Sequence, residues 1–71
     1  MTEYGAVVMC DPAVGADALR WALRRQCERD GVVPPADFNV VDGGEARDVF
    51  EWQDLPVPDP CPHYFGMRCE V

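Results

Sequence analysis

The fold is decided by residues 4–31, YGAVVMCDPAVGADALRWALRRQCERDG, in which a short apolar run is followed by a long amphipathic one. Residues 4–10 are apolar at both alternate positions, a pattern typical of an interior strand covered on two sides. Helical periodicity follows over residues 16–30, and Gly31 is expected to end the helix in the left-handed conformation. An aspartate and a proline at residues 11–12 offer an earlier helix start.

The predicted helix has one apolar stripe and one exposed tryptophan. At 100° per residue, the stripe consists of Ala16, Leu19, Leu23 and Cys27. This stripe is expected to face the sheet. Trp21 lies nearly opposite, on the side of Val14, so a helix packed on a single layer leaves this tryptophan exposed.

The middle of the chain predicts more strand. Residues 38–42 (FNVVD) are expected to form a second strand, parallel to the first and joined to it by a right-handed crossover. The Gly43-Gly44 pair is a hairpin signal. Residues 46–53 fit either a strand, with Phe50 and Trp52 on one face, or a short helix. We favour the strand.

Residues 55–62, LPVPDPCP, contain four prolines and are expected to form an extended crossing segment, because proline cannot pair in the centre of a sheet. Residues 64–71 are expected to return as a final edge strand. The sequence therefore predicts a single small acidic domain over residues 1–71. Its expected class is α/β of the α+β type, with the order β-α-β-β, a C-terminal edge strand and one helix packed on a small mixed sheet.

Negative charge is concentrated in the middle of the chain. A carboxylate falls at every third position, at Asp42, Glu45, Asp48, Glu51 and Asp54. Residues 28–59 carry nine acids against two arginines, so they account for the whole net charge of −7. Such a surface repels nucleic acid and anionic membranes and attracts cationic partners. We therefore expect a protein partner with a basic surface, no direct nucleic-acid binding and no membrane association.

The rest of the composition indicates where such a protein works. No apolar run has the roughly 18 residues of a membrane span, and the first residues do not resemble a secretory signal. We expect a cytoplasmic protein with reduced cysteines. The chain has no lysine, which is typical of GC-rich bacteria and their phages. A small acidic accessory or inhibitory protein encoded by a phage or mobile element is the resulting hypothesis.

The cysteines and the histidine suggest two alternatives. Cys61, His63 and Cys69, with Cys10 or Cys27 as a fourth ligand, have the chemistry of a zinc site that would staple a small core, although no C-x2-C pair is present. Cys10 also ends the first strand just before a helix, as in a thiol-dependent redox enzyme, but it lacks the second cysteine of a C-x-x-C motif. The favoured interpretation needs no cofactor.

The preferred function is therefore non-catalytic protein binding. Its candidate partner-binding residues are either charged or apolar anchors: Asp48, Glu51, Asp54, Trp21, Trp52 and Val14. Aromatic residues in desolvated patches contribute most to association, whereas the acids would steer a basic partner. A homodimer is a further expectation, because a single helix cannot cover both faces of a sheet.

Overall fold

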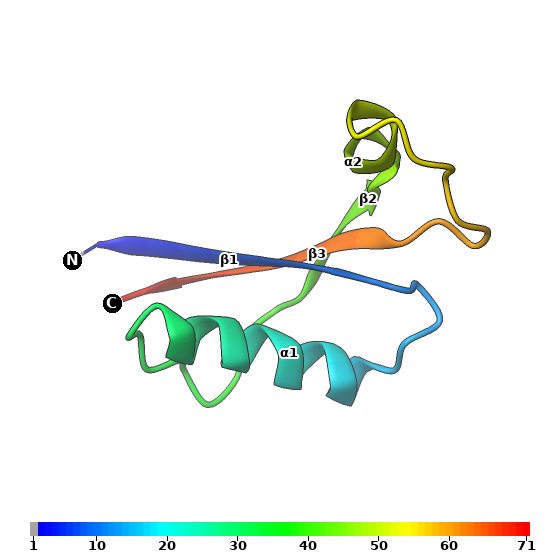
Figure 1. Cartoon of the computed structure of the whole chain (residues 1–71). Helices are drawn as coiled ribbons and strands as arrows, with labels where there is room; N and C mark the ends of the chain where they lie inside the picture. Colours follow the sequence, from blue (N-terminus) through cyan, green and yellow to red (C-terminus); the bar gives the residue numbers. More distant parts are fainter. Residues whose placement is uncertain (1) are drawn as a thin grey trace.

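The computed structural model describes residues 2–71, which form a three-stranded sheet with one long helix on one face (Figure 1). The elements in chain order are β1 (Glu3–Cys10), α1 (Ala16–Arg29), β2 (Val41–Glu45), α2 (Arg47–Trp52) and β3 (His63–Glu70). This confirms the α+β class with one main helix packed on a small sheet. The strand order is β1-β3-β2, and both pairs are antiparallel, so the sheet is not mixed.

The C-terminal strand is central and not at an edge. β3 pairs with β1 along its full length and with β2 on its other side, so β1 and β2 point the same way without touching. The crossover therefore joins two parallel strands that have β3 between them. β1 is therefore an edge strand. The prediction that both of its faces are covered was wrong for a separate reason: in residues 2–71 the helix that contacts β1 is α1, which packs on one face of the sheet. The apolar alternation of β1 has no second layer to meet.

The core lies between α1 and the sheet. Leu19, Leu23 and Cys27 are buried, which confirms the predicted stripe, while Ala16 at the first turn is exposed. Leu23 and Cys27 meet Ala6, Phe38 and Met67 in the core. Trp21 is 64% exposed, as the helical geometry predicted.

Both ends of α1 have a local cause. The helix begins at Ala16 and not at the earlier signal, where the carboxylate of Asp11 accepts a hydrogen bond from the Ala13 amide at 2.8 Å. That bond forms a separate turn. At the other end Gly31 has a φ of 73°, and the Val32 amide donates to the carbonyl of Cys27. The predicted glycine stop is confirmed.

The expected second strand begins later than predicted, because Phe38 belongs to the helix side of the core. The guanidinium groups of Arg20 and Arg24 lie 5.5 and 5.2 Å from the centre of the Phe38 ring. Arg20 also donates to the Phe38 carbonyl at 2.9 Å, and Arg24 donates to the Ala36 carbonyl at 2.7 Å. Side-chain donors thus bind carbonyls that a sheet would otherwise bind, and β2 starts at Val41.

The two glycines form a bulge and not a hairpin. Asp42 pairs with Phe65 and Glu45 pairs with His63, so the register between β2 and β3 shifts between these points. A Cβ on Gly43 would lie 3.4 Å from the Cβ of Tyr64. The glycines therefore bend β2 where it crosses β3.

Residues 46–53 form α2 and its two caps, so the favoured strand assignment was wrong. The Ala46 amide donates to the carbonyl of Pro62 at 2.8 Å, and the chain turns into the helix directly after this bond. No neighbouring strand is available for pairing, because residues 55–62 are rich in proline. That segment has neither helix nor strand, as predicted, and it connects α2 to β3.

Candidate functional site

The acidic segment, residues 42–54, occupies β2, α2 and the turn that follows. Asp42 and Glu45 lie on β2, and the other three acids lie on α2 or just after it. Figure 1 shows α2 and α1 on opposite sides of the sheet. Arg47 is the one base in the segment, and it pairs with Glu45 at 3.4 Å. The remaining carboxylates therefore leave this end of the molecule negative.

Trp52 is the most exposed aromatic residue on the acidic segment. Its side chain ends α2 and is 88% exposed, and Leu55 three residues later is half exposed. α2 contributes no buried side chain. Asp54 follows the helix with a φ of 56°, and its amide donates to the carbonyl of Glu51. An aromatic ring that serves no core and lies on the same short acidic segment as these carboxylates marks a surface available to a partner.

The acidic segment adjoins the uncovered face of the sheet. Residues that alternate with the core positions form this open face: Glu3, Gly5, Val7, Met9, Val41, Tyr64, Gly66, Arg68 and Glu70. The Tyr64 hydroxyl donates to the carboxylate of Asp48 on α2 at 2.9 Å, and this bond raises the pKa of Tyr64. Val7 and Val41 are 61% and 63% exposed and flank Gly66. Sequence reasoning missed these valines, because it treated β1 as covered on both sides.

The structure divides the predicted binding residues into two groups. Asp48, Glu51, Trp52 and Asp54 come together on α2 and its end, whereas Trp21 and Val14 belong to α1 and the turn before it. The guanidinium of Arg25 lies 5.5 Å from the centre of the Trp21 ring. The first group combines an aromatic anchor with a cluster of acids, and we take it as the candidate site.

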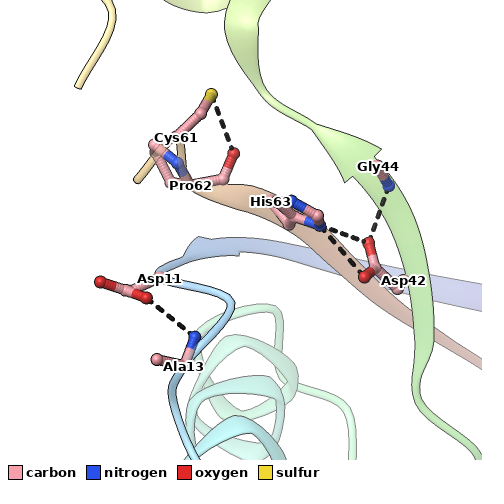
Figure 2. A network of polar contacts seen from close by, with 7 residues as sticks. All are labelled: Asp11, Ala13, Asp42, Gly44, Cys61, Pro62 and His63. Carbon is pink, nitrogen blue, oxygen red and sulfur yellow. Dashed lines mark hydrogen bonds and ion pairs between the residues drawn. The ribbon is translucent and has the colours of Figure 1, made fainter. Parts of the chain in front are cut away.

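A hydrogen-bond network joins β2 to β3 beside the bulge (Figure 2). The carboxylate of Asp42 accepts the Gly44 amide at 2.8 Å and lies 3.0 and 3.1 Å from Nδ1 of His63. The His63 ring stacks near Phe65 at 6.1 Å between centroids. The Gly44 hydrogen bond, followed by the His63 interaction, lowers the pKa of Asp42. The network fixes the bulge that carries the chain into α2.

Replacing Asp42 with asparagine is expected to weaken the acid dependence of stability. Because the folded state depresses the Asp42 pKa, the ionised carboxylate stabilises the fold above its unfolded pKa of about 4, and this contribution disappears as the pH falls through the folded value. Urea unfolding followed by circular dichroism between pH 7 and 2 measures the effect. D42N should be less stable than the wild type at pH 7 and should change less on acidification.

The matched variant is His63→Gln, which removes the smaller of the two interactions and keeps the Gly44 hydrogen bond. It should retain part of the acid dependence. Identical pH profiles for D42N and the wild type would show that Asp42 does not couple to folding.

The predicted zinc ligands are spread over the end of β1, the residues before β3 and β3 itself. Cys10 and His63 are partners in the strand register, and Cys61 is buried nearby, donating from its thiol to the Pro62 carbonyl at 3.5 Å. Cys69 lies six residues beyond His63 on the same strand, about 20 Å away at the usual strand rise. In the described part of the chain, no group of three or more potential ligands is positioned to hold an ion.

All four cysteines lie within the described residues 2–71 and are free, and Cys27 lies in the core. Burial raises the pKa of the Cys27 thiol, which keeps it neutral and inert. Cys10 is half-buried opposite His63, but the hydrogen bonds found for the His63 ring go to Asp42. Cys10 and His63 are therefore neighbours in the sheet, but they do not form the hydrogen-bonded nucleophile and base that a thiol enzyme uses.

Two further findings bear on function. Among residues 2–71, no helix has the length and apolar character needed to cross a membrane. Comparison of the chain with family models, curated proteins and solved structures gave no match.

Proposed function

We propose that this protein is a non-catalytic binding protein that docks a basic protein partner on its acidic segment and the adjoining open face. The observation that carries the proposal is Trp52, which is 88% exposed and lies among Asp48, Glu51 and Asp54. A large aromatic side chain that is not used by the core is the common energetic centre of an interface.

The charges define the chemistry of the partner. Carboxylates around an aromatic anchor favour a surface with arginines or lysines around an apolar pocket, because oppositely charged rims steer association and exclude wrong partners. The hydrogen bond between Tyr64 and Asp48 holds α2 beside the open face. A partner that reaches past α2 would therefore also cover Val41 and Val7, both of which are apolar and exposed.

This surface suits a small accessory or inhibitory protein. A basic patch on the partner, including one that otherwise holds nucleic acid, would be blocked by the acidic segment without any chemistry on this chain. Such a role agrees with the hypothesis of a phage or mobile-element protein acting in the cytoplasm of a GC-rich host. Zinc stapling and thiol catalysis remain secondary proposals, because their residues lie on β3 and β1 outside this surface.

Neutralising the acidic segment is expected to abolish salt-sensitive partner capture. The variant carries Asp48→Asn, Glu51→Gln and Asp54→Asn. The amide oxygen introduced by Asp48→Asn would still accept the Tyr64 hydroxyl, and asparagine tolerates the left-handed conformation at residue 54. The immobilised protein is used as bait against a lysate of its native host, and the bound proteins are quantified by mass spectrometry at about 0.05 and 0.5 M NaCl.

The control carries the same change of charge elsewhere, as Asp17→Asn, Glu28→Gln and Glu70→Gln. Both triple variants have a net charge of −4, which is −7 plus three. The proposal requires a protein that the wild type and the control retain at low salt and that the first variant loses. Equal loss from both triple variants would mean that only overall charge matters, and salt-insensitive retention by all three would contradict the proposal.

A further inference from the structure

The two edges of the sheet differ in their protection. β2 is five residues long, contains the glycine bulge and carries Asp42 and Glu45, all of which oppose the addition of another strand. β1 is eight residues long, has a regular register with β3, contains no proline and carries one charge, Glu3 at its start. β1 is therefore the edge that can accept another strand.

The hydrogen-bonding groups of the β1 edge can be assigned from the register. Thr2 and Val71 exchange two backbone hydrogen bonds, at 3.0 and 2.9 Å, so the even-numbered residues of β1 bond to β3. The outward amides and carbonyls consequently belong to the alternate residues, Glu3, Gly5, Val7 and Met9. Within residues 2–71, the structure shows no backbone partner for these outward groups.

Charge favours a second copy at this edge. Residues 2–27 carry three acids and three arginines and sum to zero, whereas the acidic segment lies on β2 and α2, beyond β3. Two copies that meet along β1 would therefore place their acidic segments at the far ends of the assembly. A contact through β2 or α2 would instead bring the two negative regions together.

The exposed area also indicates an unpaired surface. The chain exposes 5034 Å², compared with about 4,400 Å² expected for a compact monomer of 7.9 kDa. Its radius of gyration of 13.2 Å likewise exceeds the value of about 11 Å expected for 71 residues. The free edge of β1, the uncovered face of the sheet and α2, which has no buried side chain, all belong to this exposed surface, and pairing along β1 would cover the first of them.

We propose that two copies of this protein pair antiparallel along β1, with the two-fold axis beside Ala6, to form one six-stranded sheet. In this register Glu3 lies opposite Met9 of the copy, and Gly5 lies opposite Val7. All four outward residues then find outward partners. A shift by two residues in one direction would place Glu3 opposite Asp11 of the copy, where like charges repel, and a shift in the other direction would leave Met9 without a partner on β1.

Helix α1 fits this assembly. It packs beneath β1 and β3, so two copies would bring their α1 helices side by side beneath the joined sheet. Arg20 and Arg24 contact residues 35–38 on one flank of α1. The opposite flank begins with Ala18 and Ala22, whose short side chains let a second helix approach, and ends with the longer Gln26 and Arg29. The open face and α2 remain free, so a hetero-partner can bind at the same time.

Sedimentation equilibrium from micromolar to near-millimolar concentration tests the pairing. The wild type should approach a mass of about 16 kDa, which is twice 7.9 kDa, and the amides of Gly5 and Val7 should become protected from hydrogen exchange as it does so. Val7→Lys should weaken the dimer at least tenfold. Val7→Pro should give a monomer, because it removes an outward amide while the bonds from β1 to β3 remain.

Val41→Lys is the matched control, since Val41 flanks the same Gly66 on the other edge with nearly the same exposure. It should stay dimeric. A wild type that is monomeric at every concentration would overturn the proposal. So would a dimer that Val41→Lys dissociates and Val7→Lys does not, because such a dimer would be joined face to face.

Circular dichroism of each variant confirms folding. If Val7→Pro does not fold, Val7→Lys and the exchange of the Gly5 amide decide the outcome. A variant that stays dimeric but no longer captures the hetero-partner would bear on the proposed function of the acidic segment and not on the dimer.

Discussion

Replacing Leu23 with alanine is expected to remove about 2–5 kcal/mol of the free energy of unfolding. Leu23 is fully buried at the centre of the contact between α1 and the sheet, where it meets Ala6 and Met67. A domain of 71 residues has a total stability of roughly 4–11 kcal/mol. The substitution therefore removes a large share of it, and the variant should unfold at a clearly lower urea concentration than the wild type.

Urea denaturation at one fixed protein concentration, followed by circular dichroism, measures this loss. Tryptophan emission is a poor probe here because both tryptophans are already exposed in the folded state. Leu55→Ala is the matched control, because it deletes the same atoms from a side chain that is half exposed. It should cost less than about 1 kcal/mol. Equal losses from the two variants would show that α1 does not pack as described.

The contrast between Leu23 and Trp21 shows what helical periodicity can predict. The angle between two side chains on a helix depends only on their separation in sequence, so the buried stripe and the exposed tryptophan followed from the sequence alone. The glycine stop at Gly31 was equally local. The position of β3 was not, because strand order depends on pairing between residues such as Val8 and Phe65 that are far apart in the chain.

The wrong predictions for the middle of the chain, residues 38–53, also have physical causes. The arginines that bind the Phe38 carbonyl and cover its ring lie on α1 and cannot be recognised from residues 38–42. Residues 46–53 fit both periods, and the helix is favoured by the lack of a strand to pair with. The Asp42–His63 interaction joins residues 21 apart, and no local pattern predicts it.

The candidate site was predictable in composition but not in extent. The spacing of Asp48, Glu51 and Asp54 placed negative charge near Trp52, and the structure keeps these side chains on one short helix and its end. The contribution of β1 to the open face was not predicted, because its apolar pattern fits a strand covered on both faces, whereas α1 covers only one. Trp21 was predicted as a partner contact together with Trp52, and the two lie on different elements on opposite sides of the sheet.

That separation allows a direct comparison of the two tryptophans. Trp52→Ala is expected to weaken binding of the captured partner by about 2–4 kcal/mol, or roughly 30- to 1,000-fold in Kd, because an exposed aromatic anchor loses its whole contact area. Its effect on stability should be small, since α2 contributes no buried side chain and Trp52 contacts no core. Isothermal titration calorimetry with the purified partner gives Kd, and urea denaturation checks the fold.

Trp21→Ala is the control, because it removes the same ring from the exposed side of α1. It should leave Kd within about threefold of the wild type, although it also removes the contact with Arg25. If Trp21→Ala instead weakens binding while Trp52→Ala does not, the partner docks on α1. If neither changes Kd, the carboxylates act without an aromatic anchor. Binding that depends on Trp52 and also weakens with salt requires both the carboxylates and the tryptophan. Charge steers the partner to the acidic segment, and the indole of Trp52, once covered by the partner, holds it there.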